Sequence, residues 1–315
     1  MDAEKIFVLI SLNDEDKKKF TDAAVGYDLR FMDRNAITQN DINGAYAIIG
    51  SPDPKLLKDA RELLWLHSQS AGVDRYVKEG VLPSGVTLTN SAGAFSQAIG
   101  EYLVGALLCI YKNFHLYRDL QREASWHPLG KVKSVFGSKV LIVGAGSIGR
   151  AFATKIKALG AYTVGVRRRH ADPDECFDEM HLIDDLDALL PDFDVVAVCL
   201  PGTDETNGLF DEKRFSLMKK GSVFINIGRG NIVNQDAFAA ALSDKLLGAV
   251  VDVTDVEPLP KDSPLWDAKN LLITPHVSGH MDKSDQMVRS IALENLKRFV
   301  NNEPLTNIVD VNAGY

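Results

Sequence analysis

The sequence predicts an α/β protein with two doubly wound domains, each built on a parallel β-sheet. Short apolar segments alternate along the chain with longer segments of helical periodicity. Most of the short segments are rich in Val, Ile and Leu without polar alternation, which is typical of strands covered by helices on both faces. The alternation occurs twice, once before residue 95 and once after residue 138, so we expect two domains.

The expected strands fall into two series. The first series is 5–11, 45–50, 63–69 and 86–90, and the second is 139–146, 162–167, 195–200, 222–228, 247–253 and 271–276. The expected helices of the second series are 149–160, 211–219 and 235–244. Residues 95–121 predict one long helix with an apolar stripe, which would connect the two domains.

Composition narrows the class of protein. The chain has 315 residues, enough for about two domains, and its 43 Asp and Glu outnumber 35 Lys and Arg, giving a net charge of −8. An acidic chain lacks the basic surface of a general nucleic-acid binder or of a polybasic membrane anchor. The longest apolar run, 102–111, is too short for a bilayer, which needs about 20 residues.

The remaining global features predict a cytoplasmic protein without a metal site. The N-terminus lacks the basic and apolar regions of a secretory signal. Cys109, Cys176 and Cys199 are far apart and odd in number, so they fit neither a disulfide framework nor a zinc site. We expect them to be small reduced side chains in the cytosol.

A glycine motif gives the sharpest local signal. The apolar strand 139–143 runs into Gly144, Gly146 and Gly149, spaced as GxGxxG, and a helix follows. In such a turn the first glycine permits the tight bend, the second lets a pyrophosphate approach the backbone, and the third allows close helix–strand packing. The motif predicts a Rossmann-type dinucleotide site.

The next strand ends in basic residues where an acid is expected. An NAD-binding chain would carry Asp or Glu here for the ribose 2′-hydroxyl, but this chain has Arg167, Arg168, Arg169 and His170. Guanidinium groups can bind a 2′-phosphate through paired hydrogen bonds. The sequence therefore favours NADP(H), with NAD(H) possible; the alternative is that the arginines form a solvated turn in an NAD enzyme.

Charged residues follow three successive strands of the second series. Arg229 follows strand 222–228, Asp252 and Glu257 follow the core of 247–253, and His276 ends 271–276. The carboxyl ends of parallel strands are the edge at which ligands bind. Arg229 can bind a carboxylate and polarise a carbonyl, while His276, paired with Glu257, can exchange a proton. The pattern suits a 2-oxo or 2-hydroxy acid with a nicotinamide cofactor.

Several long segments give the chain its family resemblance. The segments are 71–76, 90–102, 143–149, 199–210, 226–238, 252–266 and 274–279. With them the chain resembles the D-isomer-specific 2-hydroxyacid dehydrogenase family, in particular its glyoxylate/hydroxypyruvate reductase-like members, over essentially its whole length. The resemblance implies two Rossmann-like or flavodoxin-like domains with a cleft between them: residues 1–95 plus 284–315 as the substrate-binding domain and 96–283 as the dinucleotide-binding domain.

The resemblance also implies roles for individual residues and a homodimer. The implied catalytic residues are Arg229, Glu257 and His276, and the implied contacts to the substrate carboxylate are the backbone of Ala71, Gly72 and Val73. Beside the glycines and arginines, the implied cofactor contacts are Ser147, Ile148, Thr206, Ile227 and Asp252. The implied function is an NAD(P)-dependent oxidoreductase acting on a small 2-oxo acid and its D-2-hydroxy acid, with NADPH as the expected reductant.

Two other functions remain open at this point. The same fold could serve a dinucleotide-sensing interaction protein, or an enzyme that acts on a substrate without a carboxylate. Trp126, which follows the long helical segment, could line a substrate pocket or contact a second copy of the chain. The side chain of the substrate is not specified by any motif.

Overall fold

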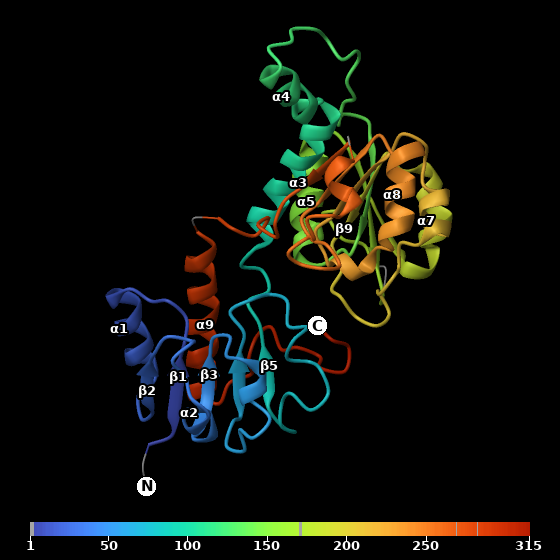
Figure 1. The fold of residues 1–315 in the computed structure, drawn as a ribbon. Helices are drawn as coiled ribbons and strands as arrows, with labels where there is room; N and C mark the ends of the chain where they lie inside the picture. The colour runs from blue at the N-terminus through green and yellow to red at the C-terminus, as the bar shows by residue number, and fades with distance from the viewer. Residues whose placement is uncertain (1–2, 170–171, 269, 282) are drawn as a thin grey trace. The chain divides into compact units, whose positions relative to one another are not determined.

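The computed structural model describes residues 3–169, 172–268, 270–281 and 283–315. The chain divides into two compact units, Met1–Phe95 with Met281–Tyr315, and Ser96–His280. The C-terminal segment thus joins the first unit from Met281 rather than from Ser284. Each unit contains one all-parallel sheet with helices around it (Figure 1), as the sequence predicts.

The first unit is a flavodoxin-like domain. Its five parallel strands follow the order β2-β1-β3-β4-β5, which is a doubly wound order. They are β1 (Lys5–Val8), β2 (Asp28–Phe31), β3 (Ala45–Ile49), β4 (Trp65–His67) and β5 (Thr87–Thr89). The helices are α1 (Asp14–Ala23), α2 (Gln39–Asn43) and α9 (Ser284–Val300). Helix α9 lies beside α1 (Figure 1) and buries Ala292 and Leu296 against the sheet with Trp65.

The second unit has the strand order of a dinucleotide-binding domain. Its seven parallel strands run β12-β11-β10-β9-β6-β7-β8. They are β6 (Lys139–Val143), β7 (Tyr162–Arg167), β8 (Glu179–Leu182), β9 (Val195–Val198), β10 (Val223–Asn226), β11 (Gly248–Val251) and β12 (Leu271–Ile273). The helices are α3 (Ser96–Tyr111), α4 (Phe114–Arg122), α5 (Ser147–Ala158), α6 (Leu186–Leu189), α7 (Glu212–Leu217) and α8 (Gln235–Asp244).

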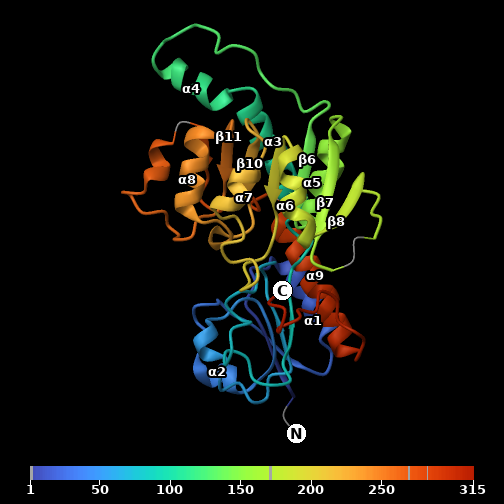
Figure 2. The same cartoon turned by 90° about the vertical axis from the view of Figure 1, so that its right-hand side faces the viewer.

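Alternate strand residues cover the two faces of this larger sheet. On one face Phe224 packs with Phe215 of α7 and Phe238 of α8, with ring centroids 5.2 and 5.7 Å away. On the other face α3 and α5 pack together, and a Cβ at Gly248 would lie 2.9 Å from Ile110 of α3. Figure 2 shows these helix layers around the strands. Burial on both faces explains why the strands are continuous apolar runs.

The prediction of one long helix over 95–121 is wrong, because the structure has two helices there. Helix α3 ends at Tyr111 and α4 begins at Phe114, because Asn113 adopts a left-handed conformation with φ 56°. Asparagine tolerates this conformation better than most residues. Two further strands, β2 and β8, are not among the expected strands. Both are edge strands in which polar and apolar residues are mixed and no residue is fully buried, so they contain no apolar run.

A fully buried histidine ends β4. The Nδ1 atom of His67 lies 2.8 Å from the hydroxyl of Thr89, and Nε2 lies 3.4 Å from the hydroxyl of Ser91. Trp65 donates from its indole to the same Thr89 oxygen at 2.9 Å. Burial lowers the pKa of His67 to about 4, so the ring stays neutral in the folded chain.

We expect this histidine to make stability depend on pH. An unfolded histidine titrates near 6.5, so below that pH the unfolded state binds a proton that the folded state does not take up until about pH 4. The contribution of His67 to the free energy of unfolding should therefore be fully present above pH 6.5. It should fall by about 1.4 kcal/mol per pH unit below that, and by roughly 3 kcal/mol in total as the pH drops to 4.

Urea unfolding between pH 4 and 7 measures this dependence. His67→Asn should flatten the pH profile, whereas His127→Asn, at an exposed position, should leave it unchanged. Parallel profiles for the wild type and His67→Asn would contradict the assignment to His67.

Candidate active site

Two of the motif glycines are required by close backbone contacts. Gly144 follows β6 with φ 108°, and a Cβ there would lie 2.7 Å from the carbonyl carbon and oxygen of Cys199. A Cβ at Gly149 would lie 2.3 Å from the carbonyl oxygen of Gly144. These contacts hold the start of α5 against the end of β6 and beside the segment after β9, so no larger residue fits either position.

The middle glycine leaves open space at the start of α5. Gly146 is the N-cap residue, no side chain caps the helix, and a Cβ at Gly146 would meet nothing within 4 Å. The first amides of a helix lack partners within it, and they favour an anion. Those of α5 belong to Ser147, Ile148 and Gly149. They lie where β6 and β9 are neighbours and the strand order reverses, so they fit a dinucleotide pyrophosphate.

The arginines after β7 differ in their contacts. Arg167 donates from Nε to the carbonyl of Ala145 at 3.0 Å and from Nη2 to Asp174 at 2.8 Å, and Arg150 also pairs with Asp174. The Asp174 carboxylate is 3% exposed, so Arg167 ties the glycine turn to a buried acid.

The two arginines that follow differ in their exposure to solvent. Arg168 pairs with Glu205 at 2.6 Å, and Arg169 is exposed. His170, the last residue of the basic run, lies outside the described residues. Arg167 is thus paired with a buried carboxylate, whereas the carboxylate that pairs with Arg168 is 64% exposed.

Two other expected cofactor residues lie in the segments after β9 and β10. The Thr206 hydroxyl donates to the carbonyl of Pro201 at 2.8 Å and accepts from the amide of Thr203 at 2.8 Å, which closes the turn after β9. Ile227 is 6% exposed and donates its amide to Val198 at 3.1 Å. Both residues shape the sheet edge that contains the glycine turn.

His276 and Glu257 form a hydrogen-bonded pair. His276 follows β12 with φ 54°, and its Nδ1 lies 3.0 Å from Oε2 of Glu257. The other carboxylate oxygen accepts the amide of Thr254 at 3.2 Å. The pair is half-exposed, at 51% for His276 and 40% for Glu257. A carboxylate on Nδ1 fixes the proton there and directs Nε2 away from Glu257.

A buried carboxylate holds the segment that carries His276. Asp252, 1% exposed, accepts hydrogen bonds from the hydroxyl of Thr274 at 2.6 Å and from the amides of Val277 and Ser278 at 2.9 Å. The carbonyl of Asp252 also accepts the His276 amide at 2.8 Å. Asp252 therefore sets the unusual backbone at His276, and its expected contact with the nicotinamide end stays a prediction.

Tyr102 and Thr274 complete this network, and no sequence motif indicates either of them. Tyr102 of α3 lies with its hydroxyl 2.6 Å from Thr274, and burial raises the pKa of Tyr102 to about 12. Because the Thr274 proton goes to Asp252, Tyr102 is the donor in this contact. In the sequence, the one indication of this role for Thr274 is its position at the end of a strand, two residues before His276.

The turn that carries Arg229 is fastened by the last residue of β10. Asn226 donates to the carbonyl of Arg229 at 3.0 Å and accepts the amide of Gly228 at 3.0 Å. A Cβ at Gly230 would lie 1.9 Å from the backbone of Thr254, so this turn packs directly on the one after β11. A Cβ at Gly202 would lie 2.9 Å from Cγ of Arg229, which places that side chain against the turn after β9.

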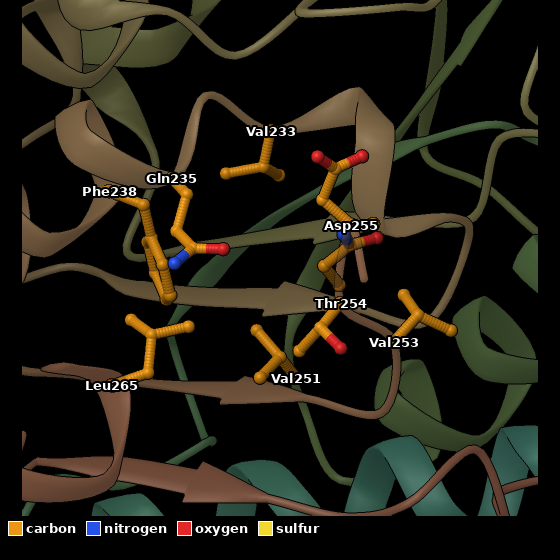
Figure 3. A pocket seen from close by; sticks show the side chains of 10 residues that line it. Val233, Gln235, Phe238, Val251, Val253, Thr254, Asp255 and Leu265 are labelled. Atoms are coloured by element: carbon orange, nitrogen blue, oxygen red, sulfur yellow. The ribbon is translucent and has the colours of Figure 1, made fainter. Parts of the chain in front are cut away.

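A small pocket lies behind these turns. Figure 3 shows the side chains that line it, which include Gln235 and Phe238 of α8 and Val251 of β11. Its lining is mostly apolar: Asn226, Gly230, Val233, Gln235, Phe238, Val251, Val253, Thr254, Asp255 and Leu265. Arg229, Glu257 and His276 do not line it, so this pocket is separate from the expected catalytic side chains.

The expected substrate loop belongs to the first unit. Ala71, Gly72 and Val73 follow β4, and Val73 is buried.

The described part of the chain contains no helix long and apolar enough to cross a membrane. Within those same residues no group of three or more His, Cys, Asp or Glu could hold a metal ion, and the three cysteines are free.

Comparisons with known proteins agree on one family. Residues 104–278, more than half of the chain, match the D-isomer specific 2-hydroxyacid dehydrogenase, NAD binding domain model. The glyoxylate/hydroxypyruvate reductase B of Cronobacter sakazakii is 30% identical over 283 residues, which cover 85% of this chain and 86% of that protein.

Solved structures give the same result over the whole fold. A D-isomer specific 2-hydroxyacid dehydrogenase family protein of Aeromonas salmonicida is 32% identical with a TM-score of 0.85, covering 98% of this chain and 100% of that one. A D-isomer specific 2-hydroxyacid dehydrogenase of Xanthobacter autotrophicus, in complex with NADPH and MES, is 27% identical with a TM-score of 0.85 and full coverage of both chains.

These relatives do not favour the alternative of a dinucleotide-sensing interaction protein. The glycine turn fits a dinucleotide, and charged residues at the neighbouring strand ends fit acid substrates. The chain belongs to the D-isomer specific 2-hydroxyacid dehydrogenase family, and it is an oxidoreductase of 2-oxo and 2-hydroxy acids that binds a nicotinamide dinucleotide.

Proposed function

We propose that the protein reduces a small 2-oxo acid, of the glyoxylate or hydroxypyruvate class, to the D-2-hydroxy acid with NADPH. The observation that carries this proposal is the His276–Glu257 pair at 3.0 Å. It lies at the same sheet edge as the Arg229 turn and the glycine turn, because β6, β10, β11 and β12 are parallel strands of one sheet. The Cronobacter relative is named for the two acids of this class.

The proposed roles follow from the chemistry of each group. Arg229 of the second unit is assigned to binding the substrate acid and polarising its carbonyl. The backbone amides of 71–73 are the first unit's own candidate for binding a carboxylate. In the direction of reduction, His276 is protonated and donates its Nε2 proton to the carbonyl oxygen as that oxygen gains charge. Glu257 holds the proton on Nδ1 and stabilises the imidazolium before transfer.

The cofactor supplies the hydride when it is bound, and this chain positions it. The first amides of α5 bind the pyrophosphate, and the residues after β9 and β10, including Thr206 and Ile227, bind the rest of the dinucleotide. Asp252 fixes the His276 segment, which would lie beside the nicotinamide end when the cofactor is bound. Oxidation of a D-2-hydroxy acid uses the same groups, with neutral His276 accepting the hydroxyl proton.

The proposed preference for NADPH rests on the partly exposed Arg168 and the exposed Arg169, which follow β7. Because Arg167 is engaged with Ala145 and Asp174, we assign the 2′-phosphate to Arg168 and Arg169, with Arg167 holding the turn in place. Glu205 pairs with Arg168 and is 64% exposed, so it can move aside for the phosphate. The Xanthobacter relative contains NADPH.

Initial rates with NADPH and NADH across a panel of 2-oxo acids test this function. One hydrogen bond from a charged group contributes about 1.5–3 kcal/mol, so we expect kcat/KM to favour NADPH by one to three orders of magnitude, roughly. Arg168→Ala with Arg169→Ala should remove most of the preference, and Arg61→Ala, an exposed arginine of the first unit, should not. Equal kcat/KM for the two cofactors in the wild type would contradict the assignment.

We further propose a cytoplasmic homodimer in which helix α4 and the segment after it contact the second copy. Phe114 is 59% exposed, Phe136 is 80% exposed and Trp126 is fully exposed, and exposed large apolar side chains of this kind are typical of a protein–protein contact. Trp126 is thus assigned to this contact rather than to a substrate pocket.

A further inference from the structure

The loop that follows β4 is hydrogen-bonded on one side to the segment that follows β5. The Ser91 hydroxyl donates to the carbonyl of Ser68 at 3.1 Å, and the Ser91 amide donates to the carbonyl of Ser70 at 3.2 Å. The side-chain amide of Asn90 donates to the carbonyl of Ala71 at 2.8 Å. Three carbonyls of the loop therefore face Asn90 and Ser91.

This arrangement sets the direction of the loop amides. In a planar trans peptide the N–H points opposite to the C=O. Among the described residues the one cis bond is Glu257–Pro258, so the amides of Ala71 and Gly72 point away from Asn90 and Ser91. Within the described parts of the chain, neither amide donates a hydrogen bond. Two adjacent amides aimed the same way can bind an anion.

Asn90 is itself held in one orientation. Its Oδ1 accepts the amide of Ala92 at 3.0 Å, so Nδ2 is the atom that faces Ala71. Its backbone exchanges hydrogen bonds with Asn307, whose side chain donates at 3.2 Å to the Asn90 carbonyl and whose carbonyl accepts the Asn90 amide at 3.1 Å. Asn90 is only 8% exposed, so water does not compete for these hydrogen bonds.

We propose that Asn90 is a positioning residue for substrate binding. By holding the carbonyl of Ala71, it keeps the Gly72 amide aimed at the carboxylate of the 2-oxo acid. Asn90 does not touch the substrate. Its effect on substrate binding passes through the peptide group between Ala71 and Gly72. This inference rests on the proposed function, which assigns the carboxylate to the 71–73 loop.

The test is Asn90→Asp, which keeps the size of the side chain and the acceptor for Ala92 but loses the donor to Ala71. We expect KM for glyoxylate, and the inhibition constant of the unreactive analogue oxamate, to rise at least about tenfold, because the carboxylate loses a well-aimed charge-assisted hydrogen bond. We expect kcat and the Kd of NADPH to stay near the wild-type values, because the contact supports the ground state and the transition state alike.

The control is Asn43→Asp, the same chemical change at an exposed position of α2, which should alter none of these values. If Asn90→Asp does not fold, Asn90→Ala is measured in its place, since it removes the same donor without burying a charge. Wild-type KM and oxamate inhibition in a folded Asn90 variant would overturn the inference. A wild-type chain that reduces no 2-oxo acid would instead contradict the proposed function, so the two failures are distinct.

Discussion

Replacing His276 with alanine should lower kcat by about 10²- to 10⁴-fold, the usual loss when a general acid or base is removed. The histidine has a carboxylate 3.0 Å from Nδ1 and a backbone fixed by Asp252, so alanine removes a proton donor that is held in one place. Steady-state rates with NADPH and glyoxylate at pH 7 measure the loss.

Binding of NADPH should be nearly unaffected by this change, since the glycine turn is intact. His181→Ala is the matched control, because His181 also pairs with an acidic residue, Glu179 at 3.2 Å, but belongs to edge strand β8. Near-normal turnover in the His276 variant, with a rate similar to that of the control, would show that another group transfers the proton.

Arg229→Ala should raise KM for the 2-oxo acid and lower kcat together. The guanidinium is expected both to bind the carboxylate and to polarise the carbonyl, and one charge-assisted hydrogen bond is worth about tenfold or more. Arg229→Lys should recover only part of the loss, because lysine cannot make the paired hydrogen bonds of a guanidinium. The separate values of kcat and KM for both variants check this prediction.

Arg229 also packs on the turn after β9, so its loss could disturb the fold of that turn. Urea unfolding of the two variants separates this effect from a loss of substrate contacts. If kcat and KM are both unchanged in a stable Arg229→Ala protein, the carboxylate binds elsewhere.

The sequence predicts the positions of the site residues better than their contacts. Arg229 and His276 follow buried strands, and parallel strands bring their carboxyl ends to one edge, so their shared edge follows from the strand pattern alone. The pairing of Arg167 with Asp174 does not follow in this way, because Asp174 lies outside the strands, where no periodicity indicates its position. The contact between Asn90 and Ala71 does not follow either, because Ala71 lies in the loop after β4.

The fold shows a similar division. Buried strands such as β6 and β9 are continuous apolar runs and can be recognised directly in the sequence. The edge strands β2 and β8 are short and mix polar with apolar residues, so their sequences do not differ from those of loops. The break between α3 and α4 depends on one left-handed residue, Asn113, within an otherwise helical pattern. A periodicity that spans both helices cannot indicate such a break.

The most direct test of the proposed reaction measures where the transferred hydride goes and which enantiomer of the product forms. The protein is incubated with glyoxylate-class 2-oxo acids that yield a chiral product, such as hydroxypyruvate, and with NADPH that carries deuterium at the transferable position of C4. We predict a D-2-hydroxy acid with one deuterium at C2, formed in a one-to-one ratio with oxidised cofactor. An L product, or a product without deuterium at C2, would contradict the account.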